Sequence, residues 1–376
     1  MEFTCRICGS ELKKQLLYYE NMPSVAQYLP DAGSLSQDVG VPLDVRQCLN
    51  CGAVQLASEP VSYYREVIRA AGVSQTILNY KKQQFEDFIA QASLAEKRVL
   101  EVGCGSGEFL SVLNALNVDA YGIEYSKELV EKCKKDGLNV FHGFIGEETD
   151  IVSQEKFDGF IMLNYLEHLP QPVQVLKGIH NNLSDNAYGL IEVPNFDMVL
   201  KNNLFSEIMR DHLLYFTKDS LQYLVNSSGF EVVSCDEVWY DYVISITVKK
   251  RKPCDVSAFE AHKAKIIDEV NSCVNSFADG EVAVWGAGHQ AFFILSCISQ
   301  PENISCILDS ADFKQGLYSP VSHIKIAPPS VLNTKRFCAL IVMAGSYSDE
   351  IVGLLKNKYS FSGQIFVLRS DGIERV

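Results

Sequence analysis

The chain has 376 residues, of which 47% are hydrophobic and 21% charged, a balance typical of a globular protein with more than one core. Its formal net charge of -14 argues against non-specific binding to nucleic acid or to an anionic membrane, because phosphate groups would be repelled. No apolar run approaches the roughly 20 residues that span a bilayer. The N-terminal MEFTCRICGS also lacks the basic start and apolar core of a signal peptide. We therefore expect a cytoplasmic protein that binds neither nucleic acid nor a membrane.

Four of the twelve cysteines form two CxxC pairs, in CRICGS and CLNCGA: Cys5, Cys8, Cys48 and Cys51. A glycine after each pair permits the tight turn that directs both thiolates at one point. Four thiolates make a closed tetrahedral site with no position for water, which indicates structural zinc. The alternatives are four unligated thiols or a redox dithiol. The sequence therefore predicts a zinc ribbon over residues 1–62, with loop and short strand between the pairs.

Residues 63–95 form a second segment, in which apolar and aromatic side chains recur at helical spacing. Gly72 interrupts the pattern. A small residue that breaks a helix is also common in lids over active sites. The segment YYREVIRAAGVSQ is therefore either a plain helical linker or a lid, and both interpretations stay open.

The stretch VLEVGCGSGEFLSVL, which begins at Val99, reads as a strand, a tight glycine turn and a helix. Glycines at every second position allow positive φ angles and let a ligand lie against the backbone: Gly103, Gly105 and Gly107. Glu101 lies at the end of the first strand. Glu124 ends the next strand, where an acidic residue accepts hydrogen bonds from ribose hydroxyls.

This turn, GCGSG after an acidic residue, resembles motif I of the class I S-adenosylmethionine-dependent methyltransferases. The resemblance implies that Glu101 and the glycine loop face the methionyl part of the cofactor and that Glu124 holds the ribose. A nicotinamide dinucleotide site, whose fingerprint is GxGxxG, and a glycine turn without any ligand are the alternatives.

Strands and helices alternate over residues 96–250, which predicts an α/β fold with a parallel, doubly wound sheet. Ligands of such sheets bind outside the carboxyl ends of the strands. Phe144 follows the third strand, where adenine would lie, although core packing is its alternative role. Leu163 and Asn164 end the fourth strand beside the expected sulfonium. His168, one helical turn later, is either a surface residue or a neighbour of the methyl group.

A second histidine, His212, lies in LFSEIMRDHLLYFT, together with Asp211 and two aromatic residues. A neighbouring carboxylate raises the pKa of an imidazole or selects its tautomer. Adjacent side chains of a strand point apart, so a direct contact between Asp211 and His212 does not follow from the sequence.

Residues 251–376 begin at the basic, proline-bearing junction KKRKPCD and continue as helix, strand, the glycine turn GAG and helix, with further strands after it. This order predicts a second Rossmann-like domain. GAG is an incomplete dinucleotide motif, so we expect no second cofactor. Three basic residues are candidate phosphate partners: His289, Lys314 and His323.

The whole chain resembles the sugar C-methyltransferases, in which a zinc-binding part, a class I methyltransferase core and a C-terminal α/β domain follow one another. In that family the segment matching FSEIMRDHLLYFT carries a Glu-His pair, and its histidine is the general base; here Asp211 replaces the glutamate before His212. The resemblance also implies that His168 lies in the active site. The family's sugar-holding tyrosine and serine stretch is matched only by Tyr64 and Ser74. The C-terminal domain is expected to help form the nucleotide-sugar cleft.

The resemblance implies methyl transfer from S-adenosylmethionine to a carbon of a nucleotide-linked keto-sugar. Such a carbon becomes nucleophilic only after a proton leaves, so we expect His212 to act as base, Asp211 to orient it, and His168 or a tyrosine to steady the enolate. An O- or N-methyltransferase on the same scaffold is one alternative, and a non-catalytic scaffold protein is the other.

Overall fold

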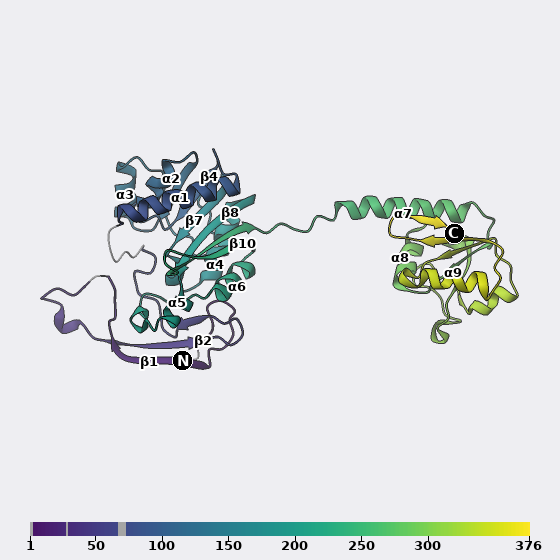
Figure 1. Ribbon diagram of the computed structural model, residues 1–376, viewed down its shortest axis with the longest axis horizontal. Helices are drawn as coiled ribbons and strands as arrows, with labels where there is room; N and C mark the ends of the chain where they lie inside the picture. The colour runs from purple at the N-terminus through teal and green to yellow at the C-terminus, as the bar shows by residue number, and fades with distance from the viewer. Residues whose placement is uncertain (1–2, 28, 67–72) are drawn as a thin grey trace. The chain divides into compact units, whose positions relative to one another are not determined.

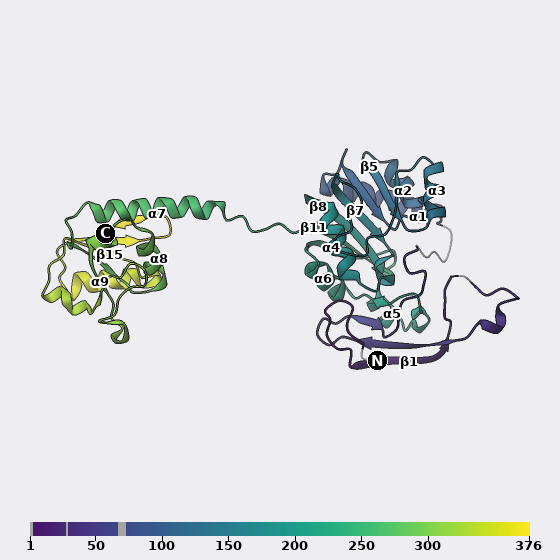
Figure 2. The same cartoon turned by 180° about the vertical axis from the view of Figure 1, so that it is seen from behind.

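The computed structural model describes residues 3–27, 29–66 and 73–376, and the chain divides into two compact units, Met1–Lys252 and Pro253–Val376. Figure 1 and the reverse view in Figure 2 show the elements of each unit. Each unit has a central sheet and hydrophobic clusters of its own. Within the described ranges, no helix combines the length and the apolar character needed to cross a bilayer.

The first unit is built on a seven-stranded sheet in the order β10-β11-β8-β7-β4-β5-β6. Its strands are β4 (Arg98–Val102), β5 (Asp119–Glu124), β6 (Val140–His142), β7 (Phe157–Leu163), β8 (Leu183–Pro194), β10 (Phe230–Val238) and β11 (Val243–Lys250). Strands β4 to β8 run parallel, as the alternation predicts. The hairpin of β10 and β11 adds two antiparallel strands, so the sheet is mixed rather than wholly parallel.

Helices cover both faces of this sheet because alternate strand residues point to opposite sides. They are α1 (Gln75–Ala92), α2 (Glu108–Asn114), α3 (Lys127–Lys135), α4 (Pro172–Asn182) and α6 (Lys218–Ser227). The short helix α5 (Phe196–Lys201) packs instead with strands of the second sheet described below. Val99 of β4 belongs to the cluster that includes Phe85 of α1. Its neighbour Leu100 belongs to the opposite cluster, with Val175 of α4 and Leu221 of α6. The strands thus end at one common edge between two helical layers.

A second, four-stranded sheet packs in the same unit, in the order β1-β2-β3-β9. Its strands are β1 (Lys14–Met22), β2 (Val41–Gln47), β3 (Val54–Leu56) and β9 (Leu214–Tyr215). The predicted loop after the first cysteine pair contains the nine-residue strand β1, whose mostly exposed side chains carry no hydrophobic alternation. β9 comes from the segment directly after His212, so the N-terminal ribbon is completed by the later part of the chain.

The second unit has a six-stranded sheet in the order β14-β13-β12-β15-β16-β17. Its elements are α7 (Ser257–Asn275), β12 (Val282–Trp285), α8 (His289–Cys297), β13 (Ile304–Leu308), β14 (Ile326–Ala327), β15 (Ala339–Val342), α9 (Ser348–Asn357), β16 (Gln364–Leu368) and β17 (Ile373–Arg375). All neighbours pair in parallel except β16 and β17. The strand order reverses between β12 and β15, which is where such sheets bind ligands.

Candidate active site

The glycine turn after β4 has the backbone conformation that its residues require. Gly103, Gly105 and Gly107 all have positive φ, at 74°, 55° and 83°. A Cβ atom on Gly103 would meet the ring of Tyr165 at 2.9 Å, and one on Gly107 would meet Leu138 at 2.6 Å. Only glycine therefore fits both the dihedral angles and the space.

Glu124, at the end of β5, ties this turn to the next strand. One carboxylate oxygen accepts the N–H of Gly105 at 2.9 Å and the other accepts the N–H of Ser126 at 2.8 Å. Burial raises the pKa of the Glu124 carboxyl. Each oxygen keeps a second lone pair for a ribose hydroxyl. Glu101 is also buried, one residue before the end of β4, so both acidic residues lie where the strand pattern predicts them.

Phe144 belongs to an aromatic group at the same edge rather than to the deep core. Its ring meets Tyr64 at 6.1 Å and Tyr125 at 6.4 Å between centroids, both edge-on. The guanidinium of Arg65 lies over the Phe144 ring at 5.5 Å. The aromatic faces and the cation form a wall suited to a flat heterocycle.

The lid or linker segment is described only in part, since residues 67–72, with Gly72, lie outside the described ranges. Before the gap, Tyr64 and Arg65 contact the aromatic group around Phe144. After it, the Ser74 hydroxyl accepts the N–H of Ile77 and caps α1.

Leu163 ends β7, and Asn164 follows it with a positive φ of 48°, in the left-handed region that asparagine adopts more readily than most residues. Asn164 lines a cavity of about 210 Å³ with Phe109 of α2 and Trp239. Lys81 and Glu192 meet in the same cavity as a buried ion pair, which sequence reasoning missed. Lys81 lies on an otherwise ordinary amphipathic helix, and only the fold brings it to the end of β8.

His168 and His212 meet although they lie far apart in the sequence. Asp211, the residue before His212, is 43 residues from His168. The rings of His168 and His212 lie 4.8 Å apart between centroids at an angle of 78°. Burial lowers the pKa of His168. Burial, with a contribution from His168, lowers the pKa of His212 to about 3. Both rings are therefore neutral near pH 7.

Asp211 holds the segment around His212 to the N-terminal region. Its carboxylate accepts the Tyr63 hydroxyl at 2.7 Å and the N–H of Ala26 at 2.9 Å, while its backbone carbonyl contacts Nδ1 of His168 at 2.9 Å. The recorded hydrogen bonds of the carboxylate thus go to Tyr63 and Ala26 rather than to the neighbouring imidazole. Tyr63 was not among the predicted site residues.

Glu167, between Leu166 and His168, was also missed. Its side chain is 2% exposed, and burial raises the pKa of its carboxyl to about 8. Its backbone oxygen accepts the N–H of Leu213, next to His212. The LEH sequence shows a carboxylate beside a histidine, but only the packing shows that both point into the interior.

The four predicted metal ligands come together: the sulfur atoms of Cys5, Cys8, Cys48 and Cys51 all lie within 4.8 Å of one another. Cys5 and Cys51 are 3.5 Å apart and Cys8 and Cys48 are 3.4 Å apart. Such separations suit four thiolates around a zinc ion with bonds of about 2.3 Å. Gly9 and Gly52 take positive φ angles after the two pairs, as the sequence predicts.

The cysteine cluster and His212 are joined through one strand pair. β3 begins shortly after Cys51 and pairs with β9. Gln55 of β3 is fully buried and donates to the sulfur of Cys5. On the other side, the N–H of Leu56 bonds to the oxygen of Leu213. The ribbon thus positions the segment that carries His212.

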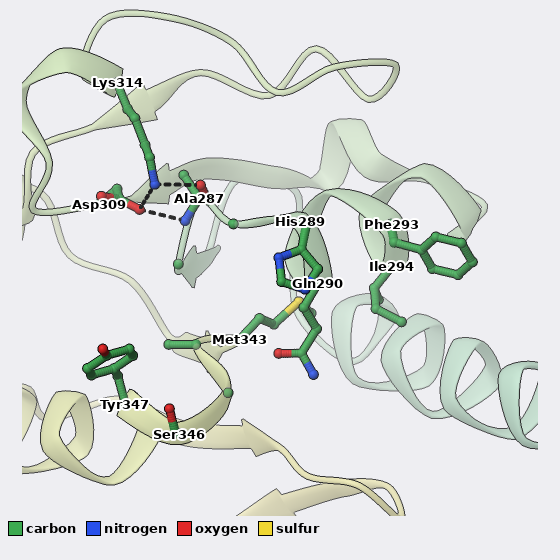
Figure 3. Close-up of a pocket in the computed structure, with 14 residues that line it drawn as sticks. Ala287, His289, Gln290, Phe293, Ile294, Asp309, Lys314, Met343, Ser346 and Tyr347 are labelled. Atoms are coloured by element: carbon green, nitrogen blue, oxygen red, sulfur yellow. Dashed lines mark hydrogen bonds and ion pairs between the residues drawn. The ribbon is translucent and has the colours of Figure 1, made fainter. Parts of the chain in front are cut away.

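The second unit contains a cavity of about 930 Å³ at the ends of β12 and β15. Asp309, after β13, accepts the N–H of Ala287 in the glycine turn and the N–H of Ala311. Lys314 donates to the oxygen of Ala287 and lies 3.3 Å from Asp309. Figure 3 shows this group on one side of the cavity, with His289 beside it and Tyr347 opposite. Of the three predicted basic residues, His323 is not among those lining it.

The class I fold of S-adenosylmethionine-dependent methyltransferases is defined by three features that this unit has. They are a glycine turn after the first strand of the parallel sheet, a buried acidic residue at the end of the second, and an antiparallel hairpin that completes the sheet. Comparison with known families agrees. Residues 75–235 match the model described as a methyltransferase domain, and residues 251–368 match that of the C-methyltransferase C-terminal domain.

Among known proteins, the chain is similar to the C-methyltransferase NovU of Streptomyces niveus, with 26% identity over 96% of this chain and 94% of that protein. It is also similar to the ubiquinone biosynthesis O-methyltransferase of Methylococcus capsulatus, with 36% identity over 23% of this chain and 39% of that protein. A solved S-adenosylmethionine-dependent methyltransferase from Clostridium acetobutylicum covers 50% of this chain and 96% of its own, with 11% identity and a TM-score of 0.40.

The chain is therefore an enzyme, an S-adenosylmethionine-dependent methyltransferase. Its second unit carries the C-terminal domain of the C-methyltransferases, and its relationship to NovU extends over both units.

Gly103→Ala is expected to weaken S-adenosylmethionine binding about tenfold or more, measured by calorimetry, because the new methyl group meets Tyr165. Gly137→Ala is the matched control, since Gly137 also has a positive φ, 80°, but open space around its Cβ position. Equal cofactor affinities of the two variants would contradict this role of the turn.

Cys48→Ser is expected to remove bound zinc and to lower the unfolding temperature, because a structural metal site contributes directly to folding free energy. Metal analysis and calorimetry measure both effects. Cys254→Ser, at an exposed cysteine of the second unit, serves as control and should change neither. A zinc content unaltered by Cys48→Ser would exclude the four-cysteine site.

Proposed function

We propose that the enzyme methylates a carbon atom beside the ketone of a nucleotide-linked sugar. The observation that carries this proposal is the contact between the buried His168 and the partly exposed His212, held against the sheet edge that also carries the cofactor turn. Two further findings support it: the C-methyltransferase C-terminal domain and the similarity to NovU. The sugar and its nucleotide rest on the resemblance to the sugar C-methyltransferases.

Methylation of carbon needs proton removal before the methyl group moves. A neutral His212 has a lone pair that accepts this proton. The carbanion, delocalised as an enolate, then attacks the methyl carbon, and the carbon–sulfur bond breaks to leave S-adenosylhomocysteine. Cofactor and acceptor are held by the protein, so positioning supplies much of the acceleration.

His168 is less suited to stabilise the enolate. Its Nδ1 contacts the carbonyl of Asp211, so the ring proton lies on Nδ1 and the lone pair on Nε2. An enolate oxygen needs a donor, and the burial that lowers the pKa of His168 disfavours its protonated form. His168 then supports the site through its contacts with Asp211 and His212.

In the second unit, we propose that the cavity beside Lys314 and His289 takes the phosphates of the acceptor's nucleotide. Backbone N–H groups at the start of α8 attract anions, and the ammonium of Lys314 lies beside the same turn. Tyr347 lines the opposite side and offers an aromatic face to a base.

The main test uses S-adenosylmethionine with a ¹³C-labelled methyl group and a nucleotide-linked keto-sugar, with products identified by NMR. A methyl group on carbon is expected, and His212→Ala should lower turnover by about 10² to 10⁴ with little change in cofactor affinity. His180→Ala, at a half-buried histidine of α4, is the control. A label on oxygen or nitrogen would favour the alternative activities.

Lys314→Ala is expected to raise KM for the nucleotide-linked sugar about tenfold, because a charge-assisted phosphate contact is lost, and to leave KM for S-adenosylmethionine unchanged. Lys335→Ala, a lysine of the same unit bonded to Ser305, is the matched control. An unaltered KM would remove Lys314 from acceptor binding.

A further inference from the structure

A second group of potential metal ligands lies apart from the four cysteines. One ligand atom from each of Glu167, His168 and His212 lies within 4.8 Å of the others. Glu167 and His168 follow one another in the short helix after β7, and His212 directly precedes the segment of β9. Two imidazoles and a carboxylate thus converge from separate parts of the chain.

His168 has the orientation of a metal ligand. Its Nδ1–H donates to the carbonyl of Asp211 at 2.9 Å, which leaves a lone pair on Nε2. Histidines that bind metals usually donate their other ring N–H to a carbonyl or carboxylate in this way. Nε2 lies 3.9 Å from a carboxylate oxygen of Glu167.

One oxygen of the buried Glu167 carboxyl group has no hydrogen-bond partner within the described ranges. That oxygen is Oε2, and the side chain is 2% exposed. The basic side chain beside this carboxyl group is His168, whose ring is neutral near pH 7 and whose Nε2 lies 3.9 Å away. Because burial disfavours the ionised form of this carboxyl group, a bound cation would offset the cost of its ionisation.

We propose that Glu167, His168 and His212 bind one divalent transition-metal cation. Two nitrogen ligands and one oxygen ligand suit zinc, manganese, iron or cobalt. Bonds of about 2.0 to 2.2 Å place ligand atoms about 3 to 4 Å apart, so these side chains need to close by about 1 Å. Three protein ligands leave positions open for water and an acceptor oxygen.

The role of this cation rests on the proposed function. The ketone oxygen of the acceptor binds at an open position, and the cation carries the negative charge that develops there, which the lone pair of His168 does not do. The proton leaves carbon for a cation-bound hydroxide, giving water, and the enolate attacks the methyl carbon as the carbon–sulfur bond breaks. In the cation-bound chain His212 is a metal ligand. In a cation-free chain the lone pair of His212 remains available to accept the proton from carbon.

The test measures metal binding without any acceptor. Manganese(II) is added to the full chain, bound ion is counted by electron paramagnetic resonance, and nitrogen coupling from imidazole is recorded. Manganese disfavours thiolate ligands, so the cysteine cluster does not compete. One ion per chain is expected, with coupling to nitrogen.

His168→Ala and His212→Ala are expected to weaken manganese binding at least about tenfold. Glu167→Gln, which preserves shape, should weaken it in the same direction. His180→Ala is the matched control and should bind like the unaltered chain. Binding of S-adenosylhomocysteine, measured in every variant, verifies that the first unit is folded.

Absence of manganese binding by the unaltered chain would overturn the proposal. Equal binding by the unaltered chain and all three variants would do the same. No acceptor takes part in this test, so a failure to bind metal does not decide whether the enzyme methylates carbon; the NMR spectrum of the product decides that. Conversely, a label found on oxygen would not contradict the metal site.

Discussion

The pairing of β3 with β9 is the contact on which the site depends. It joins residues Val54 and Gln55, just after the second cysteine pair, to Leu214 and Tyr215, just after His212. The hydrogen bonds of such a ladder fix register, and a slip of one residue would turn each side chain to the other face. The ribbon and the segment that carries His212 therefore form one structure, and neither has a complete sheet without the other. The zinc site expected in the ribbon would act on the chemistry by holding this register.

In both units, a carboxylate holds the glycine turn by hydrogen bonds. In the first, Glu124 accepts N–H groups from the glycine turn and from its own loop. In the second, Asp309 does the same with Ala287 and Ala311. A carboxylate at the end of the second strand thus fixes the turn after the first and organises it before a ligand arrives. The second unit has Lys314 beside its carboxylate, so the surroundings of the two glycine turns differ in charge.

Buried polar side chains gather at the carboxyl edge of the first sheet. Lys81 and Glu192 neutralise one another at the end of β8. Asp211 is satisfied by Tyr63 and a backbone N–H group. In the described part of the chain, Glu167 is recorded beside the neutral ring of His168 and its Oε2 has no hydrogen-bond partner. Because an unpaired charge in the interior is unfavourable, this carboxylate is the most informative departure from ordinary packing in the unit.

The sequence by itself determined the features that depend on local geometry. The glycine turn, the acids at Glu101 and Glu124 and the two CxxC pairs were all readable because their spacing dictates backbone conformation over a few residues. The tertiary structure alone decided which distant side chains meet. β9 completes the ribbon, Lys81 reaches Glu192, and Glu167 turns inward beside two histidines, because side-chain burial and long-range strand pairing arise from packing of the whole unit rather than from local periodicity.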